Sequence, residues 1–140
     1  MTIRDWLEGL SYKLVQGSLD VEVNEVVYDS RKAAPGAVFV CMKGTKIDSH
    51  DFVGQVTDAG VKVLVTEHAV EAPADVTVVE TANGREALAL LSAARFGYPS
   101  RKLTMIGVTG TKGKTTTTHM IKTILETAGK KTGMIGTNGV

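Results

Sequence analysis

The chain has 140 residues, 43% hydrophobic and 22% charged, with a formal net charge of +1 at pH 7, a composition typical of a soluble globular protein. No apolar run approaches the ~20 residues that cross a bilayer, and the start, MTIRDWLEGL, lacks the long apolar region of a secretory signal. The single cysteine, Cys41, excludes an internal disulfide and predicts a buried, unreactive thiol, so we expect a cytoplasmic protein.

The first 98 residues predict a small mixed α/β domain of ordinary size. A short helix is expected over Thr2–Gly9, with Thr2 as its N-cap and Asp5 three residues later. Four segments that are rich in β-branched residues and bounded by turn-forming residues predict strands. These segments are Val21–Tyr28, Val38–Met42, Val61–Thr66 and Val76–Glu80.

Two further helices are predicted in this part of the chain. The first covers His50–Ala59, with Asp48 or Ser49 as its N-cap. The second opens at Asn83, which caps it, and has a mostly apolar side. It is expected to end before Pro99, because the residue preceding a proline disfavours helical geometry.

A linker is predicted over Pro99–Lys102, and we place a domain boundary there, between residues 1–98 and 99–140. Three elements are predicted after it: a strand over Leu103–Val108, a helix over Lys114–Ala128 and a strand over Lys131–Gly136. The first strand is apolar throughout, as in parallel sheets buried on both faces. These elements are too few for a doubly wound sheet, which has about four to six strands, so we expect the natural chain to continue past Val140.

Charge is distributed unevenly along the chain. Residues 1–98 hold 9 Lys and Arg against 14 Asp and Glu, a net charge of −5, whereas residues 99–140 hold 7 Lys and Arg against one acid, a net charge of +6. A local positive field suits a polyphosphate ligand. We do not expect nucleic acid, because no group of aromatic residues accompanies this segment to stack against bases.

Residues 103–118, LTMIGVTGTKGKTTTT, have the layout of a phosphate-binding loop, in which an apolar run, a glycine-rich loop, Lys-Thr and a helix follow one another. Gly107, Gly110 and Gly113 are expected to let the backbone turn tightly and approach a polyphosphate. Successive N–H groups can then point at phosphate oxygens, and the positive end of the helix adds to the same spot.

This layout predicts that the chain binds ATP with Mg²⁺. Lys114 is the catalytic candidate because its ammonium group can reach the β- and γ-phosphates, and the Thr115 hydroxyl is placed for Mg²⁺. Thr117 and Thr118 are expected to serve only the helix. The predicted ATP-binding residues are Gly110, Thr111, Lys112, Gly113, Lys114, Thr115 and Thr116.

The loop departs from the commonest pattern, because Val108 stands five residues before Gly113, where that pattern has glycine. The string G-V-T-G-T-K-G-K-T-T-T instead resembles the ATP loop of the Mur ligases, which build the peptide stem of the bacterial cell wall. The earlier elements Asp-Ser-Arg at 29–31, Pro-Gly at 35–36 and Asp-x-His-x-Phe at 48–52 occur in the same order in that family. The resemblance covers essentially the whole chain.

The chain looks most like the MurE type, which joins a diamino acid, L-lysine or meso-diaminopimelate, to UDP-N-acetylmuramoyl-L-alanyl-D-glutamate through an acyl phosphate. The resemblance implies an α/β N-terminal domain that binds the UDP end of the substrate, followed by the start of the central ATPase domain. The implied substrate contacts are Tyr28, Ser30, Thr45 and Lys46. Because family members also use later magnesium ligands, a modified lysine and a third domain, this piece alone is expected not to catalyse.

Other polar residues carry weaker signals. Ser30 and Arg31 follow a strand and could bind a diphosphate or cap a turn. His50 is expected at a helix start or on the surface, and His68 is expected to be isolated, as is His119. Asp48 and Asp51 lie three residues apart and could bind a metal, but helix capping is the expected role.

Three alternative functions stay open. The first is a sister ligase, either of the MurF type or similar to folylpolyglutamate synthase. The second is a non-catalytic module that binds a UDP-sugar and keeps only a vestigial loop. The third is a signalling NTPase or kinase.

Overall fold

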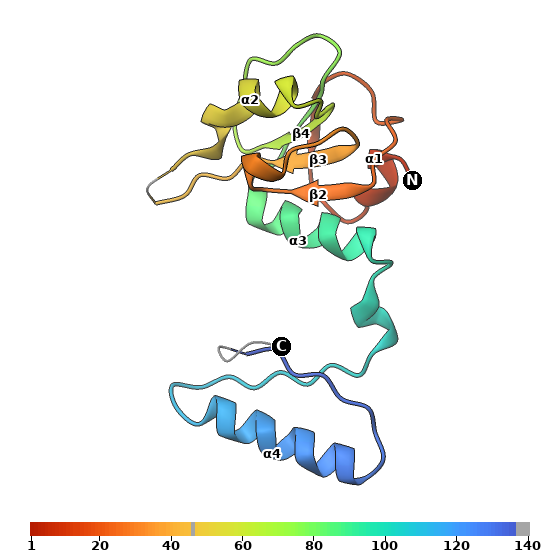
Figure 1. The fold of residues 1–140 in the computed structure, drawn as a ribbon, viewed down its shortest axis with the longest axis vertical. Coiled ribbons are helices and arrows are strands. Elements are labelled where there is room, and N and C mark those ends of the chain that lie inside the picture. The colour runs from red at the N-terminus through yellow and green to blue at the C-terminus, as the bar shows by residue number, and fades with distance from the viewer. Residues whose placement is uncertain (46, 137–140) are drawn as a thin grey trace. The chain divides into compact units, whose positions relative to one another are not determined.

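The computed structural model describes residues 1–45 and 47–136, which form two compact units divided after Lys102. Figure 1 shows the two units along the chain. The first contains α1 (Ile3–Trp6), β1 (Lys13–Gln16), β2 (Glu25–Val27), η1 (Ser30–Lys32), β3 (Ala37–Val40), η2 (Ser49–Phe52), α2 (Val53–Asp58), β4 (Val63–Thr66), β5 (Thr77–Glu80), α3 (Gly84–Arg95) and η3 (Pro99–Lys102). The second contains α4 (Lys114–Thr127).

The first unit is built on a five-stranded sheet with the order β1-β5-β4-β3-β2. Strands β2 to β5 run parallel, and β1 pairs antiparallel with β5 at one edge. Because β2 to β5 run in the same direction, the segments that follow them all leave from one edge of the sheet. Three of the residues predicted to bind substrate, Tyr28, Ser30 and Thr45, lie at this carboxyl edge.

Two hydrophobic cores cover the sheet, because apolar residues alternate between its faces. On β3, Val38 belongs to the core with α1 and α3, whereas Phe39 belongs to the core with α2. Figure 1 shows α3 on one face of the sheet and α2 on the other. Cys41 is fully buried in the second core, as predicted, and burial raises the pKa of its thiol to about 12, which disfavours the reactive thiolate.

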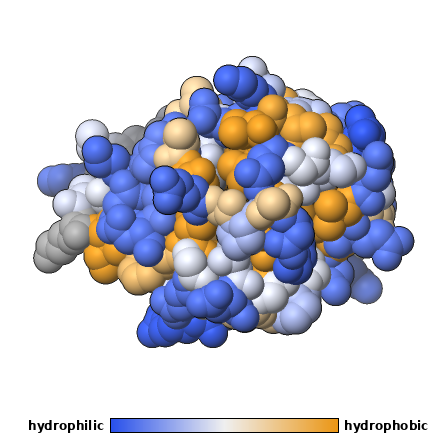
Figure 2. Space-filling model, turned by 90° about the horizontal axis from the view of Figure 1, so that it is seen from above, coloured by the Kyte–Doolittle hydropathy of each residue, from blue (hydrophilic) through white to orange (hydrophobic). Residues whose placement is uncertain are grey.

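All four predicted strands of the first unit are present, each shorter than predicted. Strand β1 was not predicted, because its residues are mostly exposed at the edge of the sheet and show no apolar alternation. On the face drawn in Figure 2, small groups of hydrophobic residues are separated by hydrophilic ones, the ordinary mixture of a protein surface.

The helix predictions hold, with changes at the ends. Thr2 and Asp5 form the expected capping box, with the Thr2 N–H donating to Asp5 at 2.8 Å, but α1 ends already at Trp6. Residues 49–52 form a 3-10 turn before α2, and Asp48 rather than Ser49 is its cap. None of the helices among the described residues has the length and hydrophobicity needed to cross a lipid bilayer.

The second unit differs from its prediction in its strands. Helix α4 begins at the expected Lys114, but residues 103–108 form no strand, and neither do residues 131–135. Met105 and Ile135 are 67% and 84% exposed. A strand of this apolar type is stabilised by paired neighbours and by burial on both faces. Residues 103–136, as described, provide neither.

Candidate functional site

The glycine-rich loop ends in the backbone conformation that its sequence predicts. Gly113 immediately precedes α4 and has φ 76°, the left-handed region that favours glycine, and Gly110 also has a positive φ. Gly107 does not, and a Cβ placed there meets no described atom within 4 Å. The backbone conformation at Gly107 therefore does not itself require glycine, and its close approach to a polyphosphate stays a prediction.

The N-terminus of α4 differs from that of α3. At α3, the Asn83 side chain accepts from the N–H groups of the second and third helical residues at 3.0 and 3.2 Å, and the Gly84 N–H donates to Glu67 at 2.8 Å. In the described part of the chain, α4 has no side-chain cap. Since the first N–H groups of a helix need partners, α4 offers an open site for an anion and α3 does not.

The threonines at the start of α4 fall into two pairs. The Thr117 hydroxyl donates to the Gly113 carbonyl at 2.9 Å, and the Thr118 hydroxyl donates to the carbonyls of residues 114 and 115 at 3.0 and 2.8 Å, so both serve the helix as predicted. Among the residues that the structure describes, the hydroxyls of Thr115 and Thr116 have no hydrogen-bond partner. They remain available to a ligand, and a hydroxyl oxygen is a ligand type that Mg²⁺ accepts.

Lys114 folds back over the loop. Its ammonium group donates to the Gly110 carbonyl at 2.6 Å, which places the positive charge within the turn that precedes the helix. Thr111 and Lys112 are exposed in the same turn. The loop thus brings together a lysine, unpaired hydroxyls and exposed backbone, a donor set that suits a polyphosphate and its magnesium ion.

The residues predicted to bind the UDP end follow neighbouring strands. Tyr28 comes directly after β2 and is 60% exposed, and Ser30 opens η1 two residues later. Thr45 is exposed in the loop after β3, the parallel neighbour of β2, so all three lie at the carboxyl edge of the sheet. In the described ranges the Ser30 hydroxyl has no hydrogen-bond partner. Lys46 lies outside the described residues.

Arg31 is held by hydrogen bonds to Asp29. Its guanidinium donates to both Asp29 carboxylate oxygens, at 2.9 and 2.6 Å, and its N–H donates to the same side chain at 3.1 Å. These hydrogen bonds lower the pKa of Asp29 to about 2. The sequence allows Ser30 and Arg31 either to bind a diphosphate or to cap a turn. These hydrogen bonds favour turn capping for Arg31, and none of those in the described ranges engages the Ser30 hydroxyl.

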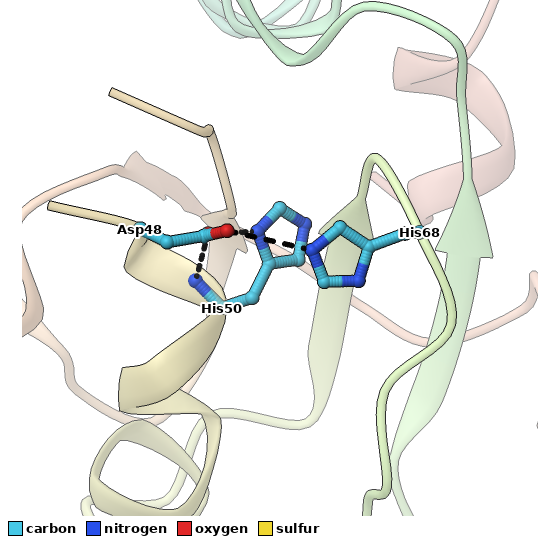
Figure 3. A group of neighbouring side chains, drawn as sticks. All are labelled: Asp48, His50 and His68. Carbon is cyan, nitrogen blue, oxygen red and sulfur yellow. Dashed lines mark hydrogen bonds and ion pairs between the residues drawn. The ribbon is translucent and has the colours of Figure 1, made fainter. Parts of the chain in front are cut away.

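Asp48, His50 and His68 form a cluster at the end of the loop that follows β3 (Figure 3). Asp48 caps η2 through the His50 N–H at 3.0 Å, and its Oδ1 lies 2.5 Å from His50 Nδ1. The His68 ring stacks on that of His50 with centroids 3.8 Å apart. The expectation that His68 is isolated is therefore wrong. His50 lies at a helix start as expected, but it is buried.

The hydrogen bonds of His50 fix its tautomer. Its Nε2 accepts the backbone N–H of Glu67 at 2.9 Å, so the ring proton is on Nδ1 and is donated to Asp48. A histidine that binds a metal through Nδ1 carries its proton on Nε2, where it would face the Glu67 N–H. The three side chains are close enough to hold a metal, but these bonds argue against one.

Glu67 joins the cluster to two other elements. Its carboxylate accepts the Lys43 N–H at 2.9 Å and the Gly84 N–H at 2.8 Å. Burial raises the pKa of the carboxyl group, but these two hydrogen bonds and the nearby positive charges outweigh it and bring the pKa below its usual value. Sequence reasoning missed Glu67 and His68, although both directly follow β4 and so lie at the carboxyl edge of the sheet.

The carboxylate of Asp48 predicts a pH effect. Hydrogen bonds from His50 lower the pKa of Asp48 to about 2, so the ionised form stabilises the fold at pH values above about 4 and this contribution disappears as the pH falls towards about 2. Asp48→Asn should therefore lower the free energy of unfolding most at neutral pH, and the difference from wild type should shrink between about pH 4 and pH 2. Urea unfolding at several pH values measures this difference, with Asp58→Asn on α2 as the control for losing one surface carboxylate. A difference independent of pH contradicts the prediction.

In comparisons with known proteins, the family model and the relatives described here are all Mur ligases. A model of the Mur ligase family, catalytic domain, matches residues 22–96, which lie in the first unit. Over 137 residues the chain is 43% identical to the UDP-N-acetylmuramoyl-L-alanyl-D-glutamate–2,6-diaminopimelate ligase of Clostridium perfringens, covering 98% of this chain and 28% of that protein. It is 40% identical over 139 residues to the corresponding L-lysine ligase of Staphylococcus haemolyticus, covering 99% and 28%.

Solved structures of similar fold include two MurF enzymes. A MurF structure from Acinetobacter baumannii superimposes with a TM-score of 0.69 at 31% identity, over 90% of this chain and 27% of that one. MurF from Thermotoga maritima in complex with ADP gives a TM-score of 0.55 at 26% identity, over 75% and 24%. The chain thus spans 28% of the length of the curated relatives described above.

Proposed function

The chain belongs to the Mur ligase family, and from this premise we propose that it is part of an ATP-dependent ligase acting on UDP-N-acetylmuramoyl-L-alanyl-D-glutamate. The ligase joins a diamino acid, L-lysine or meso-diaminopimelate, to that substrate in peptidoglycan synthesis. One observation carries the proposal: similarity to ligases of this name runs through both units, from the sheet to the glycine-rich loop. We place the reaction in the cytoplasm, where ATP is supplied.

The proposed reaction has two steps. The γ-carboxylate of the substrate's glutamate attacks the γ-phosphate of ATP, which gives an acyl phosphate and releases ADP. The amino group of the diamino acid then attacks the acyl carbon, and inorganic phosphate leaves as the amide forms. Phosphoryl transfer of this kind depends chiefly on positioning and on neutralising the phosphate charge.

The second unit supplies these needs through its own groups. The Lys114 ammonium leaves the Gly110 carbonyl for the β- and γ-phosphates, and the open N-terminus of α4 binds phosphate oxygens. Lys112 adds positive charge, and Thr116 contributes a hydroxyl. Mg²⁺, held in part by the Thr115 hydroxyl, neutralises phosphate charge when it is bound.

The first unit is proposed to hold the other end of the substrate. Tyr28, Ser30, Thr45 and Lys46 contact the UDP group, with residues 1–98 as the substrate-binding domain and 99–140 as the start of the ATP-binding domain. The carboxyl edge of a parallel sheet is a common position for ligand sites. The unpaired Ser30 hydroxyl supports this assignment.

A second candidate is the MurF reaction, which the structural matches favour. A third matching structure, at 31% identity, is named as the UDP-N-acetylmuramoylalanyl-D-glutamyl-2,6-diaminopimelate–D-alanyl-D-alanyl ligase of Acinetobacter baumannii. The two candidates differ in the substrate that binds. Isothermal titration of the complete ligase with the UDP-linked dipeptide and the UDP-linked tripeptide separates them, and preferential binding of the tripeptide overturns the first proposal. Ligation assays with L-lysine and with meso-diaminopimelate then identify the amino acid.

Ser30→Ala tests the substrate site in the complete ligase. Loss of one hydrogen bond to the ligand should weaken binding of the UDP-linked dipeptide by about 3- to 10-fold and leave ATP binding unchanged. Titration calorimetry with each ligand measures this effect. The control is Ser18→Ala, since Ser18 lies beside Thr77 at the start of β5, away from the carboxyl edge. Equal affinities for both variants remove Ser30 from the site.

A further inference from the structure

The loop over residues 43–48 has a closed base and an exposed tip. Lys43 and Asp48 pair as an isolated antiparallel bridge, and the Gly44 N–H donates to the Ile47 carbonyl at 2.9 Å. A Cβ on Gly44 would lie 2.7 Å from that carbonyl oxygen, so the turn requires glycine. Thr45 is exposed at the tip, and Ile47 is 64% exposed. Thr45 and Ile47 are therefore exposed to solvent above a base that backbone hydrogen bonds hold in place.

Both ends of this base are anchored to Glu67. The Glu67 carboxylate accepts the N–H of Lys43, the first residue of the loop, at 2.9 Å. The Glu67 N–H donates to His50 Nε2 at 2.9 Å, and His50 Nδ1 in turn donates to Asp48, the last residue of the loop. The hydrogen bonds therefore form a closed circuit, in which the buried His50 side chain links the end of β4 to the far end of the loop. The exposed His68 ring makes a longer contact with the same carboxylate, 3.6 Å from Nε2 to Asp48 Oδ2.

His50 is suited to hold the loop and not to meet a ligand. Its side chain is 4% exposed, and both ring nitrogens are engaged within the protein. It therefore has no free nitrogen with which to bind substrate or transfer a proton. Such a residue acts through what it positions, and a ligand site needs its loops held to about 0.5 Å.

We propose that His50 is a positioning residue, which holds the 43–48 loop to the end of β4 so that Thr45 meets the UDP end of the substrate. The inference rests on the proposed function, because that function assigns Thr45 to the UDP group. Beyond that function, the affinity for the UDP-linked substrate would depend on two hydrogen bonds of His50, a residue that does not contact the substrate.

Three variants of the complete ligase test the two hydrogen bonds of His50 individually and together. His50→Asn retains a donor near the position of Nδ1 for Asp48 and loses the acceptor for Glu67, whereas His50→Gln retains the acceptor and loses the donor. Each is expected to raise KM for the UDP-linked dipeptide about 10-fold, with kcat and KM for ATP within about two-fold of wild type. His50→Leu loses both bonds and should raise this KM further.

The control is His119→Gln, a histidine substitution on the exposed part of α4. Steady-state kinetics are measured with each substrate varied, and thermal unfolding is followed in parallel. If the His50 variants lose stability and kcat while KM for the UDP-linked dipeptide is unchanged, His50 is only structural and the proposal is overturned. Wild-type KM and kcat in all three variants overturn it as well, while ligation by the wild-type enzyme keeps the proposed function intact. If the wild-type enzyme does not catalyse ligation, both the proposed function and the positioning role of His50 are overturned.

Discussion

Lys114→Ala is expected to lower kcat for ligation at least about 100-fold in the complete ligase. In the proposed reaction the substitution removes a positive charge that would neutralise the β- and γ-phosphates in the transition state, and a single such stabilising group is typically worth about 10²- to 10³-fold. The ammonium already lies in the loop, 2.6 Å from the Gly110 carbonyl, so no rearrangement of the helix is needed to bring it to the nucleotide. Release of ADP in the presence of the UDP-linked dipeptide and the diamino acid measures the rate.

Lys122→Ala is the matched control for this experiment. Lys122 lies on the same helix and pairs with Glu126 at 3.8 Å, an exposed contact that contributes little to stability. Its removal should leave the rate within about two-fold of wild type. If Lys114→Ala retains near wild-type activity, Lys114 is not in the site. If nucleotide affinity in that variant is also unchanged, the chain is better explained as a binding module with a vestigial loop.

Gly84→Ala is expected to lower the free energy of unfolding by about 2 to 4 kcal/mol. A Cβ at this position would lie 2.6 Å from the Cys41 carbonyl oxygen and 2.8 Å from Met42 Cγ. The carbonyl belongs to the backbone that continues β3 and cannot move without disturbing the sheet, so the start of α3 must shift outward. That shift also stretches the hydrogen bond from the Gly84 N–H to Glu67.

Gly54→Ala provides the comparison on another helix. Gly54 lies in α2, has no positive φ, and its added Cβ meets no described atom within 4 Å. Alanine is the better helix former, so this variant should be unchanged or more stable by up to about 1 kcal/mol. Urea unfolding of both variants gives the difference. Similar stabilities for the two alanine variants would show that α3 can move away from β3 at little cost.

Local signals predicted much of the fold and of the glycine-rich loop. The Asn83 cap, the start of α4 at Lys114 and the left-handed Gly113 each depend on interactions within a few residues of sequence. The roles of Thr117 and Thr118 were predictable for the same reason, since their hydroxyls bond to carbonyls three and four residues earlier.

Contacts between distant segments decided the rest. Strand β1 exists because it pairs with β5, more than 60 residues later, and its own sequence is too polar and exposed to predict it. The strand predicted over residues 103–108 fails for the opposite reason, because its apolar pattern is suitable but no paired strand accompanies it in residues 103–136.

The sequence alone determined that this chain has a glycine-rich loop before a helix and a mixed α/β domain before that loop, because spacing, capping residues and β-branched runs act over short distances. Only the tertiary structure decided that Glu67 anchors both ends of the 43–48 loop, that His50 is buried between two partners, and that Gly84 must be glycine. The partners that join Glu67 to Lys43, His50 and Gly84 are 17 or more positions apart in sequence, and they come together because parallel strands deliver their carboxyl ends to one edge.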